Sequence, residues 1–327
     1  MARSPEGAQS VGTVVIAGAA NLTIAAAKVL AGLLSGSAAV LSEAAHSFAD
    51  TTTEVLLFVA LRRGARPADE ERPFGHGRES YVWAFLAAVF TFVGGGIFSV
   101  TQGVHAIQTD QRQDDNLIAY LVLVISFVAE SVSLIRATRQ IQGRARRFSV
   151  SLGQVVRRTP DTTVKAVFFE DSAALIGLVL AAAGVGLSQL TGSPFWDGLA
   201  SIMIGVLLLV VAVTLARSNL SLLLGRAAGP ATRAEIYDEL VRVPTVQRID
   251  TLLTLQLGPD EILVAAKIDF ADDATGATIE AAADEAERRL IARNPAVRFV
   301  FLDPTGSRAP DNPTGSRAPD NPNAEPD

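Results

Sequence analysis

Residues 195–215 read FWDGLASIMIGVLLLVVAVTL, a run in which Asp197 is the single charged side chain. At a rise of about 1.5 Å per residue, roughly 20 apolar residues are enough to cross the hydrocarbon core of a bilayer. A soluble helix of this length would carry a polar face, and this run has almost none. The stretch therefore predicts a membrane-spanning helix.

Five further runs have the same character, and they predict an integral membrane all-α bundle of six helices. They lie at about residues 11–34, 38–61, 81–107, 117–135 and 164–190. The first run is too long for the apolar part of a signal peptide and contains Lys28, so we expect it to remain as the first helix. Only 19% of the chain is charged, against about 25% in ordinary soluble domains. A large soluble helical bundle is therefore the weaker alternative.

Basic residues favour one side of this predicted bundle. The three-to-four loop has Arg112 alone, whereas the arginines gather in the two-three loop, in the four-five loop and after helix six: Arg62, Arg63, Arg66, Arg72, Arg78, Arg139, Arg144, Arg146, Arg147, Arg157, Arg158, Arg217, Arg226 and Arg233. The positive-inside rule then predicts that both chain termini are cytoplasmic.

The chain has no cysteine, which excludes disulfides and thiolate metal sites. Its net charge of −6 argues against a nucleic-acid partner.

The six apolar runs form a predicted transmembrane domain over residues 11–224, and the residues after it predict a small cytoplasmic α+β domain over residues 227–304. Alternating apolar positions and turn residues indicate the order α-β-β-α-β. A domain of roughly 75 residues is only marginally stable alone, and pairing with a second copy would bury more surface. Residues 305–327 contain the repeat PTGSRAPDN twice and cannot build a core. We expect this tail and residues 1–10 to be disordered.

Ionisable side chains interrupt the second and fifth predicted helices, where each is costly to bury and indicates a functional site. His46 and Asp50 are four residues apart and share one helix face, with Glu43 one turn earlier; Glu170 and Asp171 lie in the fifth run. An imidazole and several carboxylates in a low-dielectric site suit a divalent cation. Zinc accepts these ligands, and so do manganese, iron and cobalt. The alternative is a structural hydrogen-bond network between the two helices.

Other polar residues in the apolar runs have less defined roles. Lys28 and Asn21 lie on roughly one face of the first helix. Lys28 either neutralises Glu43 or Glu170, or extends to the membrane interface. We expect a structural pairing for Glu130 and a surface or packing role for His105.

The chain resembles the cation diffusion facilitators. The resemblance rests on six spans, His46-x-x-x-Asp50, the acidic pair of helix five, the loop RPADEERPFGHGR at residues 66–78 and the α-β-β-α-β domain. It implies a secondary transporter that exchanges a divalent metal, most often zinc, for protons. It also implies a homodimer with its cytoplasmic domains in contact. The metal ligands that it implies are His46, Asp50 and Asp171.

The sequence also departs from the family pattern. Val167 stands where the family commonly has a second histidine, and the run FFEDSAALIG at residues 168–177 looks like the zinc transporter nine branch. Glu170 lies about 100° around the helix from Asp171 and would reach the ion through a local shift or a water molecule. Zinc remains favoured, while manganese, iron and cobalt gain weight.

The two-three loop offers a possible second metal site. Asp69 and His76 match positions that some family members use for a second zinc, but Arg72 stands where a partner histidine is expected. A capping or salt-bridge role is therefore favoured for this loop.

Two other function classes remain as alternatives. A membrane sensor or scaffold that does not transport would use its buried charges structurally. An enzyme is disfavoured, because the sequence shows no nucleophile–base arrangement, no phosphate-binding glycine loop and no ATPase motif. We expect no cofactor beyond the transported metal.

Overall fold

The structure is a computed structural model that describes residues 6–109, 117–147 and 161–306. The chain divides into two compact units. The helical unit comprises Met1–Arg66 and Glu79–Leu220, and the sheet unit comprises Pro67–Arg78 and Ser221–Asp327. Residues 1–5, most of the repeat tail and the arginines at positions 157 and 158 lie outside the described residues.

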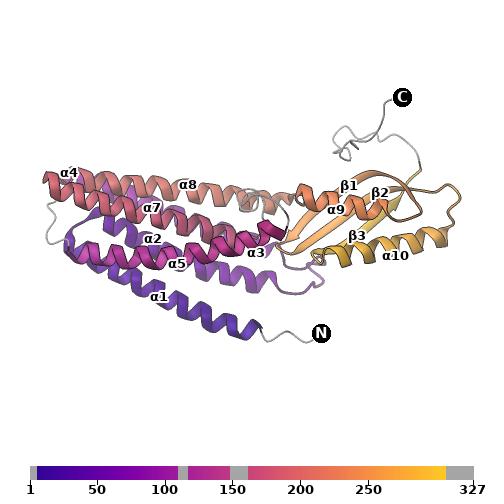
Figure 1. Cartoon of the computed structure of the whole chain (residues 1–327), viewed down its shortest axis with the longest axis horizontal. Helices are drawn as coiled ribbons and strands as arrows, with labels where there is room; N and C mark the ends of the chain where they lie inside the picture. Colours follow the sequence, from indigo (N-terminus) through magenta and orange to yellow (C-terminus); the bar gives the residue numbers. More distant parts are fainter. Residues whose placement is uncertain (1–5, 110–116, 148–160, 307–327) are drawn as a thin grey trace, which may run out of the picture. The chain divides into compact units, whose positions relative to one another are not determined.

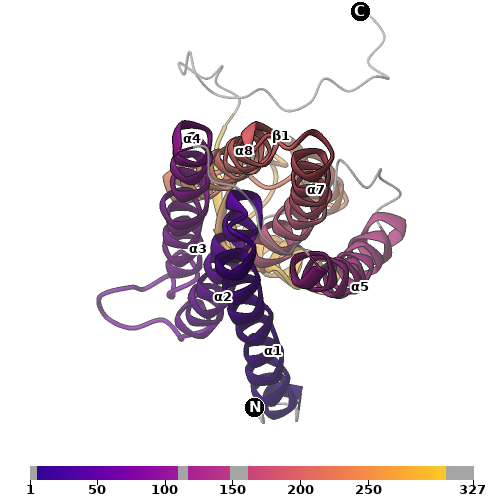
Figure 2. The same cartoon turned by 90° about the vertical axis from the view of Figure 1, so that its left-hand side faces the viewer.

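The helical unit consists mainly of long helices (Figures 1 and 2). The helix α3 continues through the π-helical segment η1 into α4. The bounds are α1 Glu6–Ser35, α2 Ala38–Gly64, α3 Glu79–Phe90, η1 Thr91–Ile97, α4 Phe98–Thr109, α5 Leu117–Arg147, α7 Thr162–Thr191 and α8 Phe195–Gly225.

Within the described residues, four helical stretches are long and apolar enough to cross a membrane by length and composition: the α3–α4 stretch, α5, α7 and α8. In α1, the part whose side chains the structure describes is a shorter apolar helix, Asn21–Ser35. The helix α2 carries a row of polar and ionisable residues in place of a continuous apolar surface. These findings establish a membrane-type helical unit, and the count of six spans stays a prediction.

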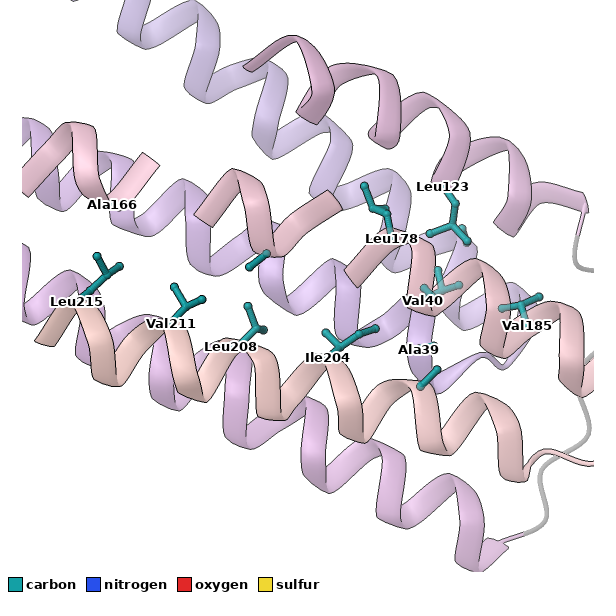
Figure 3. Packing of buried hydrophobic residues seen from close by; sticks show 14 of the residues in the cluster. Ala39, Val40, Leu123, Ala166, Leu178, Val185, Ile204, Leu208, Val211 and Leu215 are labelled. Carbon is teal, nitrogen blue, oxygen red and sulfur yellow. The ribbon is translucent and has the colours of Figure 1, made fainter. Parts of the chain in front are cut away.

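The helix α2 is central to this unit and packs against α1, α3, α4 and α7 (Figure 2). Figure 3 shows the buried apolar cluster, in which the labelled side chains of α8 lie along one side of that helix: Ile204, Leu208, Val211 and Leu215. Close backbone approach is possible where glycines meet. A Cβ built on Gly205 would lie 2.8 Å from the carbonyl oxygen of Gly96, as expected for small residues at interfaces between membrane helices.

The sheet unit has the predicted order α-β-β-α-β. Its elements are α9 Pro230–Val241, β1 Val246–Gly258, β2 Glu261–Phe270, α10 Gly276–Arg293 and β3 Val297–Pro304. The strand β2 is central, antiparallel to β1 and parallel to β3. The parallel pair requires a crossover, which α10 supplies. The core is formed by both helices and the sheet, with Leu240, Val264, Ile268 and Leu290 almost fully buried.

The loop Pro67–Arg78 belongs to the sheet unit, although it connects α2 to α3 in the chain. The Phe74 ring packs edge-on against the Phe299 ring of β3, with 5.2 Å between the centroids. Gly77 lies against the β1–β2 turn, where a Cβ would be 2.8 Å from the Leu257 carbonyl oxygen and 3.0 Å from Gly258 Cα. The absence of a side chain at Gly77 therefore permits this packing.

Candidate metal site in the membrane helices

Of the three candidate site residues of α2, Glu43 and His46 are buried and Asp50 is partly exposed. Glu43 and His46 are at most 1% exposed, and the Asp50 side chain is 17% exposed. His46 Nε2 lies 3.4 Å from Asp50 Oδ2, a contact that does not satisfy hydrogen-bond geometry. The predicted i,i+4 pair is therefore adjacent on one helix face, as its spacing requires.

The two acidic residues of α7, Glu170 and Asp171, have different surroundings. Glu170 is buried, and its Oε1 has no hydrogen-bond partner among the described residues. Asp171 is partly exposed, and its Oδ2 accepts a hydrogen bond of 2.7 Å from Ser133 Oγ on α5. Asp171, expected as a ligand, is thus engaged by α5, while the less certain candidate Glu170 keeps a free acceptor.

The helices α2 and α7 pack against each other and run antiparallel. Asp197, near the start of α8, accepts hydrogen bonds from Ser37 Oγ and Ala38 N, each 2.6 Å long. Because α8 follows α7 after a short connection, this cap places the end of α7 beside the start of α2. A carboxylate at a helix N-terminus also satisfies amide groups that have no partner within the helix.

A close contact fixes which faces of these two helices meet. The carboxylate of Glu43 lies against Gly177, where a Cβ would overlap Glu43 Oε1. Asp50 follows Glu43 by seven residues, and Glu170 precedes Gly177 by seven. Seven residues are about two helical turns, so in antiparallel helices Asp50 and Glu170 lie at the same level on facing sides.

Unpartnered polar atoms concentrate in this region. Of the ten buried side-chain atoms without a hydrogen-bond partner in the described part of the chain, five belong to it: Glu43 Oε1, His46 Nδ1, His46 Nε2, Asp50 Oδ1 and Glu170 Oε1. A buried polar atom without a partner costs about 1–3 kcal/mol. Nitrogen and carboxylate oxygen are donors that suit a divalent transition metal. Across the described residues, no three histidine or acidic side chains are already close enough together to hold an ion.

The helix α1 contributes a buried cation beside this cluster. Lys28 is 0% exposed, and its Nζ lies 3.2 Å from Glu43 Oε2 and 2.7 Å from Ser47 Oγ. Of the roles considered for Lys28, the structure shows the pairing with Glu43, and extension to the membrane interface is wrong. Asn21 Nδ2 donates to Glu54 Oε1 at 2.7 Å, so the polar face of α1 meets α2.

Sequence reasoning overlooked several residues around the site. Glu54 follows Glu43 by eleven residues, which is about three turns, and this spacing could have identified it. Ser133, Asp197 and Gly177 carry no such local signal, because their roles depend on neighbouring helices. His105 is exposed on α4, in agreement with a surface role.

The two candidate residues of the 67–78 loop are brought together with Arg72. His76 Nε2 lies 2.8 Å from Asp69 Oδ2, and Arg72 Nη1 lies 2.9 Å from His76 Nδ1. The Asp69 carboxylate also accepts from Arg72 N at 2.8 Å. The hydrogen bond from His76 is the main cause that lowers the pKa of Asp69, followed by the Arg72 amide. A guanidinium donates and does not ligate a metal, so the arrangement resembles a capped salt bridge.

Comparison with known proteins relates the helical unit to a protein family. The family model described as the cation efflux transmembrane domain matches residues 14–224. The chain is 33% identical over 243 residues to the proton-coupled zinc antiporter SLC30A9, mitochondrial, of Xenopus laevis; the match covers 74% of this chain and 44% of that protein. The chain thus spans less than half the length of this relative.

Two other matches differ in extent from this one. The cation-efflux pump FieF of Shewanella oneidensis is 28% identical over 281 residues, which cover 82% of this chain and 88% of the pump. A solved C-terminal domain of MamM in a nickel form matches 24% of this chain at 14% identity, with a TM-score of 0.23. The match over residues 14–224, together with the apolar helices, shows that the chain belongs to the cation efflux family of membrane transport proteins.

Proposed function

We propose that this chain is a secondary transporter that exports a divalent metal cation, with zinc favoured, in exchange for protons. The observation that carries the proposal is the set of five buried, unpartnered nitrogen and oxygen atoms on the facing helices α2 and α7. An arrangement that served only to connect the helices would satisfy these atoms with one another. Here the unpartnered atoms of His46, Asp50 and Glu170 remain available to an ion that brings its own positive charge.

The proposed ligands are His46 and Asp50 from α2 with Asp171 and Glu170 from α7. Glu170 lies opposite Asp50 and has an unpartnered oxygen. Asp171 would reach the ion by exchanging its hydrogen bond with Ser133 for a metal bond. One imidazole with carboxylates is a harder ligand set than one with two imidazoles, so manganese, iron and cobalt are the alternative cargo.

Proton exchange follows from the chemistry of these ligands. His46 must be neutral and the carboxylates ionised to hold a metal, so metal binding releases protons. If the site opens alternately to each side of the membrane, metal leaving on one side lets protons enter in its place. The names of the matched zinc antiporter and efflux pump support this activity.

The assembly proposed for the transporter is a homodimer with both termini in the cytoplasm. The arginine distribution supports the orientation. A sheet unit built on three strands and two helices is small enough to gain from pairing with a second copy.

The test is metal-driven proton movement in proteoliposomes that contain the purified full chain, across zinc, manganese, iron and cobalt. Wild type should show a signal for at least one metal, and His46→Ala or Asp50→Asn should abolish it. His105→Ala, which changes the exposed histidine of α4, serves as the matched control and should leave the signal intact. If correctly folded and inserted protein shows no signal for any metal, the transport proposal is wrong and a sensor or scaffold role takes its place.

A further inference from the structure

The buried ion pair between α1 and α2 includes a second contact from the lysine, made next to the candidate metal site. Lys28 Nζ contacts both Glu43 Oε2 and Ser47 Oγ, and Ser47 directly follows the candidate ligand His46. Both charged side chains are 0% exposed. Because the two contacts, Glu43 and Ser47, flank His46 along α2, the ammonium group lies beside that histidine. The ammonium group therefore lies within the electrostatic field of the candidate site.

Glu43 is held on two sides. Lys28 binds one carboxylate oxygen, and the other oxygen lies in a gap on α7 that exists because residue 177 is glycine. This second oxygen has no hydrogen-bond partner among the described residues. Glu43 is thus a carboxylate one turn from His46 that is held by a lysine and points at backbone.

We propose that Lys28 is a positioning residue of the transport site, a permanent internal cation that retains Glu43 and keeps this carboxylate from joining the metal ligands. This inference rests on the proposed function. It assigns the metal to His46, Asp50 and the α7 carboxylates, and it assigns Glu43 to Lys28 throughout the transport cycle.

The consequence is a site that binds metal less tightly than its carboxylates permit. A fixed ammonium repels a divalent cation, and a carboxylate already paired with lysine attracts the cation less than an unpaired one. A transporter must release its cargo, so an arrangement that limits affinity favours turnover. Removing the lysine charge would leave Glu43 buried without a partner, which is costly unless a metal or a proton replaces the ammonium.

The test compares metal dissociation constants and transport rates for the full chain. Lys28→Met should bind metal about tenfold tighter or more, with a lower KM and a lower maximal rate. Lys28→Arg keeps the charge and should stay near wild type. Lys28→Met combined with Glu43→Gln removes both charges and should return the affinity toward that of wild type.

Lys165→Met is the matched control, because Lys165 is also a buried lysine of the helical unit, whose Nζ donates to Ser218 Oγ at 2.8 Å. A purely structural ion pair predicts lower thermal stability for both lysine variants with no change of metal affinity, and that outcome would overturn the proposal. If Lys28→Met does not fold, Glu43→Gln decides, because it leaves the ammonium of Lys28 without its carboxylate. Weaker metal binding in that variant supports the proposal, since an uncompensated ammonium repels a divalent cation more strongly, and unchanged affinity contradicts it. A wild-type chain that neither binds nor transports metal would instead disprove the proposed function.

Discussion

Asp50 on α2 and Glu170 on α7 lie at the same level of two antiparallel helices, each two turns from the contact between Glu43 and Gly177. Asp171, one residue further along α7, is bound to Ser133. The relationship predicts which acidic residue of α7 matters more for the bound ion.

The first prediction concerns Glu170. We expect Glu170→Gln to weaken metal binding at least as much as Asp171→Asn, by about tenfold or more, because Glu170 faces α2. Isothermal titration of the detergent-solubilised chain measures both constants. Ser172→Ala is the matched control, since the Ser172 hydroxyl donates to Phe168 O of its own helix at 2.6 Å. A large loss in Asp171→Asn with no effect in Glu170→Gln would contradict the facing geometry.

The second prediction concerns the gap that receives Glu43. Gly177→Ala adds a methyl group where Glu43 Oε1 lies, so the carboxylate must move or the helices must separate. Overpacking of this kind costs about 1–3 kcal/mol. We expect a lower thermal midpoint and slower transport.

Gly186→Ala is the control for that experiment, because it makes the same change in the same helix where the nearest atom is Tyr120 Oη at 3.3 Å. Equal stability and equal transport in the two alanine variants would show that Glu43 does not need the gap.

The third prediction concerns the loop that packs in the sheet unit. A Cβ at Gly77 would meet backbone atoms of Leu257 and Gly258, which cannot rotate away as a side chain can. Gly77→Ala should therefore destabilise the sheet unit by about 1–3 kcal/mol, measured by chemical unfolding. Gly276→Ala has open space around the new methyl group and should be neutral or slightly stabilising. Equal unfolding midpoints would count against close packing of this loop.

The fourth prediction is a pH dependence from Asp69. The hydrogen bond from His76, and then the Arg72 amide, lower the pKa of Asp69 in the folded chain. The ionised carboxylate thus contributes stability above its unfolded pKa, near 3.9 for a free aspartate. This contribution is lost as the pH falls through the lower folded pKa.

The wild-type chain should lose this contribution to its stability as the pH falls, and Asp69→Asn, which has no carboxylate to protonate, should not. Thermal unfolding midpoints measured from pH 7 down to pH 3 test the difference. Glu70→Gln, at the neighbouring exposed position, should behave like wild type. An acid profile that is identical in wild type and Asp69→Asn would show that this network does not contribute to stability.

Much of the fold was predictable because it depends on local patterns. Long apolar runs predicted the membrane-type helices, and alternation predicted the order α-β-β-α-β of the sheet unit. The spacing of His46 and Asp50 placed both on one face, since four residues are close to one helical turn. These features follow from the periodicity of a single element.

The sequence by itself determined the helices, the order of elements in the sheet domain and the candidate metal ligands. Only the tertiary structure decided that Lys28 pairs with Glu43 instead of Glu170, that Glu170 faces α2 while Asp171 turns to Ser133, and that the 67–78 loop packs in the sheet unit. The physical reason is that a helix apolar on nearly every side carries no pattern that sets its rotation. Its rotation, and therefore the partner of each polar side chain, is set by packing against helices distant in the sequence.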